Sequence, residues 1–492
     1  MFERITPEAA GISSGKITRM IKFLERNGVV LHSLLFMKGE KLFGEYYWTP
    51  FHRDFLHRMY SQTKSFVGIA IGILEEEGKL SLDDKIVKYF PDKTNGDLHK
   101  YLSEQTVRDM LTMRTAVRAP SWFTTEDPDR THEYFCASEI LRPSGTLWEY
   151  DSAGSQVLSS LVERLSGMTL FDFLNEKIFK HLGTFKNASI LKTPNGDSWG
   201  DSALLCTSRD MLSFGRLLLN GGIFEGKRLI PEKYLSEATS KIADNHTTAF
   251  HTYNSRGYGY QIWKNGMGGF SFHGMGSQFT VCIPSLDLVI VCTGDNQGYN
   301  PTANQLIFAA IEEFIYTDAS TLPLKEDPLS LANLEEYTKS LRLAVSEGAC
   351  ESPWKGRIDG KRYTFEKSPF GWRSFKISFS GNGGVLTYEN EQGEKALPFG
   401  FGENVFCKFP QFGYSNDTGG VRTTDGFLYD CASSAGFLEE NKLSLRIQVI
   451  DKYFGNMFMT FAFKGCEVAV NMGGVAEDFL KEYQGFAVGY TD

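Results

Sequence analysis

Residues 61–74 read SQTKSFVGIAIGIL, and this stretch is the most informative in the chain. After Ser65 it is almost wholly apolar, which predicts a helix buried on all sides. Ser61 and Lys64 are three positions apart, and such residues share one face of a helix. Serine is a weak nucleophile that needs an adjacent base. A lysine shielded by apolar helix can have its pKa lowered enough to accept the serine proton.

The S-x-x-K pattern alone is weak evidence, because it occurs at four places: Ser13/Lys16, Ser61/Lys64, Ser189/Lys192 and Ser352/Lys355. Only the second pair heads a helix apolar enough to be buried. The alternative interpretation of Ser61 is an N-terminal helix cap beside a solvated lysine.

A second element is WEYDS at residues 148–152, followed at once by a helical pattern. In an extended loop, residues i and i+2 point the same way, so Tyr150 and Ser152 are expected to face a cleft together. A phenol held near an ammonium favours phenolate and can serve as a general base. The alternative is a tyrosine packed at a helix entrance, with the serine as its cap.

A third element is FHGMGSQ at residues 272–278, between two strand patterns. Glycine lets the backbone approach a ligand closely. A backbone N–H here, together with that of Ser61, would form an oxyanion hole. The alternative is that His273 is a structural histidine beside a glycine-rich bend.

Helical and strand patterns alternate in blocks along the first part of the chain. We expect a helix over 14–26, a hairpin over 31–47, a mainly helical stretch over 62–240, strands at 258–264, 269–273, 277–283 and 287–293, and a helix over 301–316. This order predicts an α+β fold. One antiparallel sheet flanked by helices collects strands from both ends, and a helical subdomain is inserted between them.

The composition changes after about residue 320. A Pro- and charge-marked linker with a helix is expected over 321–346, and short strands separated by Gly turns fill the rest of the chain. The predicted domains are therefore 1–320, 321–346 and 347–492. The last is an all-β domain, closed into a barrel or sandwich to protect its strand edges. It is also the candidate surface for self-association.

The composition excludes several classes of protein. The chain has 492 residues, 41% of them hydrophobic and 23% charged, which is ordinary for globular domains and excludes disorder. A net charge of −9 argues against nucleic-acid binding. The sequence lacks a long apolar run and an N-terminal signal pattern, so we expect no membrane span and a cytoplasmic location. The eight cysteines show no metal-ligand spacing, and no metal or cofactor is expected.

The order of the three elements resembles that of the β-lactamase-related serine hydrolases, which include class C β-lactamases, D-alanyl-D-alanine carboxypeptidases and esterases. The resemblance covers roughly residues 10–317. Its flanking motifs are closest to the subgroup containing 6-aminohexanoate-dimer hydrolase. They lie at residues 78–91, 106–115, 205–215, 257–263 and 273–278.

The resemblance implies a role for each motif residue. Ser61 is the acylated nucleophile, Lys64 is the general base or its hydrogen-bond partner, and Tyr150 is the second acid or base. The oxyanion donors are the N–H of Ser61 and one from the third motif. Substrates of this family are small esters, amides or peptides, and no organic cofactor is implied.

The chain departs from the lactamase pattern in two motifs. Ser152 stands where the second motif has Asn, and the Lys-Thr-Gly of the third motif is replaced. Aligning the glycine gives Phe272-His273-Gly274 with Met275 N–H as the oxyanion donor, whereas aligning His273 with the lysine gives His-Gly-Met. We prefer the first alignment because it preserves the glycine.

In either alignment the lysine that would bind a carboxylate is missing, and His273 supplies only part of that charge. This disfavours β-lactamase and carboxypeptidase activity and favours a neutral ester or amide substrate. Trp122, Tyr260 and Trp263 are candidates for the substrate pocket, beside the alternative that these rings are core. Segment 118–135 is a candidate lid.

The sequence therefore predicts a serine hydrolase using Ser61, Lys64 and Tyr150. The alternatives are an acyltransferase on the same site and a penicillin-binding-like sensor without turnover. Hydrolysis and transfer differ only in what attacks the acyl-enzyme.

Overall fold

The computed structural model describes residues 2–94, 96, 98–120, 127–246, 251–411, 428–477 and 479–491. The chain divides into two compact units, each described here by itself. The first holds the chain up to Asn296 and residues 302–342. The second holds residues 297–301 and the described residues after 342.

A seven-stranded sheet forms the centre of the first unit, in the order β1-β3-β2-β14-β13-β12-β11. Its strands are β1 (Glu3–Arg4), β2 (Leu31–Lys38), β3 (Lys41–Tyr47), β11 (Trp263–Lys264), β12 (Phe270–Gly274), β13 (Gln278–Ile283) and β14 (Leu288–Gly294). The short β1 pairs parallel with β3, and the other neighbouring pairs are antiparallel. The predicted sheet, built from both ends of this unit, is confirmed.

The strand predicted over 258–264 is shorter than expected, because only Trp263–Lys264 joins the sheet. Gln261 has a left-handed φ of 57°, which takes the backbone out of the extended conformation just before β11.

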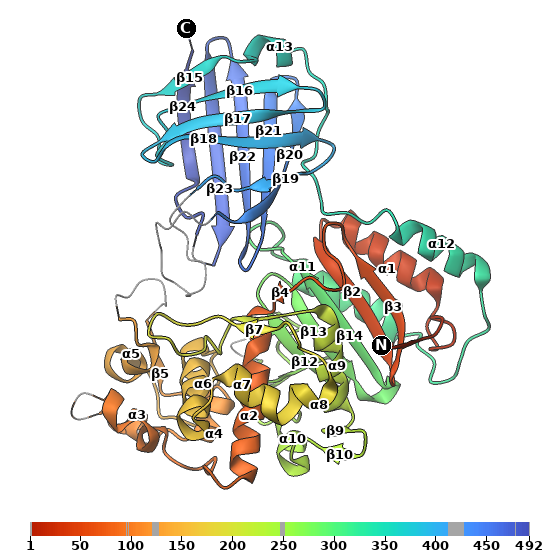
Figure 1. Cartoon of the computed structure of the whole chain (residues 1–492), viewed down its shortest axis with the longest axis vertical. Helices are drawn as coiled ribbons and strands as arrows, with labels where there is room; N and C mark the ends of the chain where they lie inside the picture. The colour runs from red at the N-terminus through yellow and green to blue at the C-terminus, as the bar shows by residue number, and fades with distance from the viewer. Residues whose placement is uncertain are drawn as a thin grey trace. The chain divides into compact units, whose positions relative to one another are not determined.

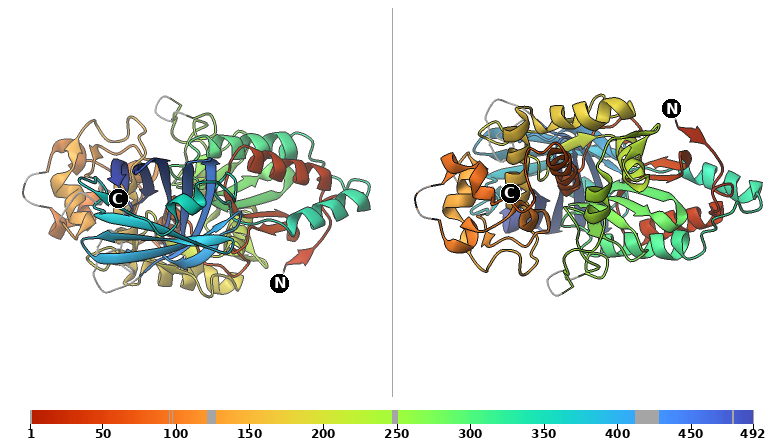
Figure 2. Two further views of the ribbon diagram at one scale, coloured as in Figure 1. Left: turned by 90° about the horizontal axis from the view of Figure 1, so that it is seen from above. Right: turned by 90° about the horizontal axis from the view of Figure 1, so that it is seen from below.

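Helices cover both faces of this sheet (Figures 1 and 2). On one face lie α1 (Ser14–Arg26) and α11 (Ala303–Ala310), with α12 (Pro328–Thr338) packed against α1. On the other face lie α2 (Thr63–Glu76) and α9 (Ser208–Leu219). Because side chains alternate along a strand, Leu34 and Phe36 of β2 enter the first core, whereas Leu35 and Met37 enter the second.

The helical insertion is also confirmed. Its helices are α3 (Lys100–Ser103), α4 (Val107–Leu111), α5 (Arg130–Ala137), α6 (Ser152–Ser166), α7 (Leu170–Leu174), α8 (Lys180–Leu182) and α10 (Glu232–Ala238). Short strands connect them: β4 (His57–Arg58), β5 (Val117–Arg118), β6 (Glu139–Ile140), β7 (Ser189–Ile190), β8 (Leu204–Cys206), β9 (Ile223–Phe224) and β10 (Lys227–Arg228).

The second half of the candidate lid forms a helix. Asp129 caps α5 by accepting hydrogen bonds from two backbone N–H groups, and Thr131 Oγ1 donates to Ser160 Oγ of α6 at 3.0 Å. This part of segment 118–135 therefore packs on α6 within the insertion, and residues 121–126 lie outside the described residues.

The second unit is all-β apart from α13 (Lys355–Ile358), as predicted. A ten-stranded sheet closes on itself through pairing of β18 with β20 (Figure 1). Its strands are β15 (Arg362–Phe365), β16 (Ser374–Ser380), β17 (Gly383–Asn390), β18 (Gly393–Phe401), β19 (Val405–Lys408), β20 (Asp430–Glu439), β21 (Lys442–Ile450), β22 (Phe454–Lys464), β23 (Glu467–Ala476) and β24 (Gln484–Tyr490).

None of the described helices combines the length and apolarity that a membrane span requires.

The tight packing of α2 generates a stability prediction. A Cβ on Gly72 would lie 2.2 Å from Cδ1 of Tyr234 in α10. We expect Gly72→Ala to lower the free energy of unfolding by about 1–3 kcal/mol through overpacking, despite alanine's higher helix propensity. Urea unfolding followed by circular dichroism measures this change.

Gly15→Ala in α1 is the matched control, because its nearest neighbours lie at an ordinary 3.6 Å. It should be neutral or slightly stabilising. Equal effects of the two substitutions would contradict the packing explanation.

Candidate active site

Ser61 lies in a 3-10 turn, η1 (Tyr60–Gln62), that runs directly into α2. Tyr60 adopts a left-handed φ of 47° just before it. Thr63 Oγ1 donates to Tyr60 O at 2.6 Å and accepts from Leu204 N at 3.0 Å. Strand β8 therefore fixes the turn from the side, which places Ser61 at the start of the buried helix.

Lys64 lies beside Ser61, as the i, i+3 spacing predicts. Its Nζ donates to Ser61 Oγ at 2.9 Å and to the main-chain oxygen of Asp201 at 2.6 Å. The Asp201 carboxylate lies 3.7 Å from the same nitrogen, and the Lys64 side chain is only 2% exposed. The lysine is therefore buried and held at three points, so the interpretation of Lys64 as a solvated side chain is wrong.

Tyr150 precedes α6, where Asp151 caps the helix by accepting from Gly154 N at 2.8 Å. The Tyr150 ring stacks on Trp263, with centroids 5.6 Å apart and planes 23° apart. Lys64 Nζ lies 5.1 Å from the centre of the Tyr150 ring. The second motif and the S-x-x-K pair therefore meet, while Ser152 becomes the first residue of α6.

Gly274 ends β12 where that strand passes the nucleophile turn. A Cβ on this residue would lie 2.3 Å from Met59 O, so only glycine fits. Met275 follows and is 39% exposed, and Gln278 Nε2 holds its carbonyl at 2.9 Å. This close approach supports the alignment in which Gly274 is the family's glycine and Met275 N–H is an oxyanion donor.

His273 is buried. Its ring stacks on Trp263 at 4.9 Å and 8°, and its Nε2 hydrogen-bonds Ser271 Oγ at 2.7 Å. Burial lowers the pKa of His273 to about 3. The partial positive charge expected at this position is therefore absent near neutral pH, because the imidazole is neutral there.

The structure separates the three aromatic pocket candidates. Trp263 lies between the rings of Tyr150 and His273. Tyr260 instead packs on Tyr234 in the core, and its hydroxyl donates to Glu237 at 2.8 Å. Trp122 lies outside the described residues.

Two buried carboxylates act on Lys64: Asp151, which lies in the second motif, and Asp201, which no motif indicates. Burial raises the pKa of both Asp151 and Asp201, and the Lys64 ammonium opposes that rise. Arg58 also acts on Asp201. Across the described residues, no three His, Cys, Asp or Glu side chains are grouped as a metal ion would require.

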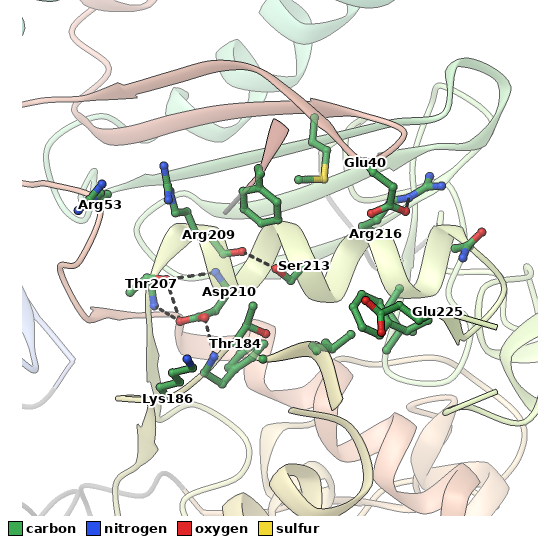
Figure 3. Close-up of a pocket in the computed structure, with 18 of the residues that line it drawn as sticks. Glu40, Arg53, Thr184, Lys186, Thr207, Arg209, Asp210, Ser213, Arg216 and Glu225 are labelled. Carbon is green, nitrogen blue, oxygen red and sulfur yellow. Dashed lines mark hydrogen bonds and ion pairs between the residues drawn. The ribbon is translucent and has the colours of Figure 1, made fainter. Parts of the chain in front are cut away.

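A groove of about 960 Å³ flanks α9 (Figure 3), but it is lined by other residues than Ser61, Lys64 and Tyr150. The three arginines that line it are engaged in ion pairs, Arg53 with the neighbouring Asp54. Arg209 pairs with Glu45, and Arg216 pairs with Glu40 and Asp287. We therefore assign the groove no part in the chemistry of the serine.

Comparison with known proteins shows the family to which the chain belongs. The Beta-lactamase family model matches residues 20–311. The 6-aminohexanoate-dimer hydrolase of Paenarthrobacter ureafaciens is 26% identical over 282 residues, which cover 53% of this chain and 71% of that enzyme. The chain therefore belongs to the Beta-lactamase family, and this relative is a hydrolase.

Two solved structures share the fold. A Bacillus anthracis protein assigned as a 6-aminohexanoate-dimer hydrolase aligns with a TM-score of 0.52 and 19% identity, over 64% of this chain and 86% of that one. The structure of SurE with D-Leu aligns with a TM-score of 0.50 and 15% identity, over 88% of this chain and 94% of that one.

The neutrality of His273 generates a pH prediction. Its pKa in the folded state, about 3, lies below the value of about 6.5 in an unfolded chain. The unfolded state therefore binds the proton first, and stability is lost as the pH falls below about 6.5. His273→Gln keeps a hydrogen-bond partner for Ser271 but cannot take up the proton. Between about pH 7 and pH 5, the free energy of unfolding should therefore fall by about 2 kcal/mol less in this variant than in the wild type.

Urea unfolding of both proteins across this range tests the prediction. A wild-type-minus-variant difference that does not change with pH would contradict it.

Proposed function

We propose that this protein is a serine hydrolase that cleaves a neutral ester or amide through an acyl-enzyme on Ser61. The observation that carries the proposal is the 2.9 Å hydrogen bond from the buried Lys64 Nζ to Ser61 Oγ. Family membership and the hydrolase named among the relatives support it.

In acylation, Ser61 Oγ bonds to the substrate carbonyl carbon, and its proton passes to the Lys64–Tyr150 pair. The carbonyl oxygen becomes an oxyanion, held by the N–H groups of Ser61 and Met275. When the carbon–leaving-group bond breaks, the same pair returns a proton to the departing alcohol or amine.

In deacylation, water attacks the acyl carbon and gives its proton to the same pair. The acyl–Ser61 bond then breaks, Ser61 regains a proton and the acid leaves. An alcohol in place of water would give acyl transfer by identical steps.

The walls of the site favour a neutral substrate. The third motif provides a neutral imidazole where related motifs have lysine, and the partly exposed Tyr150 ring stacks on Trp263. An apolar acyl chain packs well against such rings. We also propose a cytoplasmic location, which cell fractionation tests. Self-association through the second unit is a further proposal, which mass measurement in solution tests.

The nucleophile assignment makes the first functional prediction. A fluorophosphonate probe should add once to the wild-type chain by intact mass, and not to Ser61→Ala. Turnover of p-nitrophenyl esters should fall by about 10³-fold or more. Ser13→Ala is the matched control, because Ser13 also begins an S-x-x-K sequence but caps α1 without a side-chain hydrogen bond.

Retained turnover in a folded Ser61→Ala protein would reject the proposal. A single burst without steady turnover would favour the sensor, and an added alcohol appearing in the product would reveal the acyltransferase.

Tyr150→Phe gives a second prediction. The ring can keep its stacking on Trp263, whereas the phenol oxygen is lost. We expect kcat to fall by about 10²–10⁴-fold, the usual contribution of general acid–base catalysis, with a smaller change in KM. A change in KM alone would assign Tyr150 to substrate binding.

A further inference from the structure

Asp201 is the closest charged neighbour that the structure gives to Lys64. It lies between β7 and β8, far along the chain from the S-x-x-K segment. Its main-chain oxygen accepts from Lys64 Nζ at 2.6 Å, and its carboxylate lies 3.7 Å from that nitrogen. The side chains are only 2% and 5% exposed, so water contributes little to solvating either charge.

A buried ammonium needs a counter-charge, because removing it from water is costly. Asp201, Asp151 and Tyr150 are titratable groups that the described structure places near Lys64, and Arg58 acts on the same Asp201. Asp151 already serves as the cap of α6, and Tyr150 presents its ring face to the ammonium. Asp201 therefore supplies the nearest negative charge.

Asp201 is in turn held near a second cation. The guanidinium of Arg58 lies between the rings of Tyr60 and Trp199, at 4.7 and 4.4 Å, and its Nε donates to Ser202 O at 3.1 Å. Arg58 favours the ionised form of Asp201. Burial raises the pKa of Asp201, and the positive charges of Lys64 and Arg58 oppose that rise.

We propose that Asp201 is a positioning residue that keeps Lys64 as an ammonium aimed at Ser61 Oγ. The inference rests on the proposed function of Ser61. Lys64 then acts as a charged hydrogen-bond donor, and the Ser61 proton passes to the phenolate oxygen of Tyr150, which becomes a phenol. When the leaving group departs, Tyr150 returns that proton to it.

The alternative is that Asp201 only pairs with Arg58 and supports the segment before β8. A structural role of this kind would lower activity equally at every pH. A role in the charge of Lys64 would instead change the pH at which activity is lost, because removing the counter-charge makes the ammonium easier to deprotonate.

The test is Asp201→Asn in the full-length protein, which removes the charge and keeps the shape and the main-chain carbonyl. The readouts are the rate of Ser61 labelling by a fluorophosphonate and kcat/KM for a p-nitrophenyl ester, from about pH 5 to pH 10. We expect the alkaline loss of activity to move down by about 1–3 pH units, the effect of losing an opposite charge within 4–6 Å.

Asp201→Glu, which restores the charge, should recover part of the wild-type profile. Asp201→Ser is a second charge-removing variant, used if the asparagine protein does not fold. Asp210→Asn is the matched control. It removes another buried carboxylate, one that caps α9 and accepts from Phe185 N at 2.7 Å. Its alkaline limb should match that of the wild type.

An unchanged alkaline limb in folded Asp201→Asn would overturn the inference and leave the proposed function intact. Higher activity of this variant at neutral pH would also overturn it, because Lys64 would then act as a neutral base. Absence of Ser61-dependent labelling in the wild-type protein would reject the proposed function and this inference together.

Discussion

The burial of one ammonium constrains the whole active site. Lys64 is placed inside the protein by the apolar helix that follows it, where a charge without partners would be strongly unfavourable. Its nitrogen is held by a serine hydroxyl, a main-chain carbonyl and a carboxylate that come from two separate parts of the chain. The helix, the β8 segment and the tyrosine loop must therefore assemble together for the site to exist.

The same constraint explains why the nucleophile turn is so closely supported. Strand β8 pairs with β4 on one side of the turn and binds Thr63 on the other. Gly274 brings β12 so near to Met59 that any side chain there would displace the strand. The nucleophile turn is thus held by two strands, and sites built on strands and helices are positioned more precisely than sites on loops.

Local patterns in the sequence predict the parts of this arrangement that depend on local geometry. The spacing of Ser61 and Lys64 places them on one helical face, and the strand patterns on either side of Gly39 predict the hairpin over 31–47. The role of Asp201 could not be predicted from the sequence, because a main-chain carbonyl has no sequence pattern and its partner, Lys64, lies in a distant segment. The charge state of His273 also depends on burial beneath Trp263, which only the assembled sheet reveals.

The second unit is discontinuous in sequence, since residues 297–301 belong to it although they connect β14 to α11. The ring of Tyr299 stacks on Phe458 at 5.4 Å, and the Arg446 guanidinium lies 4.2 Å from the same ring. The all-β unit is therefore not an appendage that recombination could exchange by a single crossover near residue 343. Such an exchange would also have to include residues 297–301, which lie between β14 and α11 of the first unit. We therefore expect the two units to be inherited together.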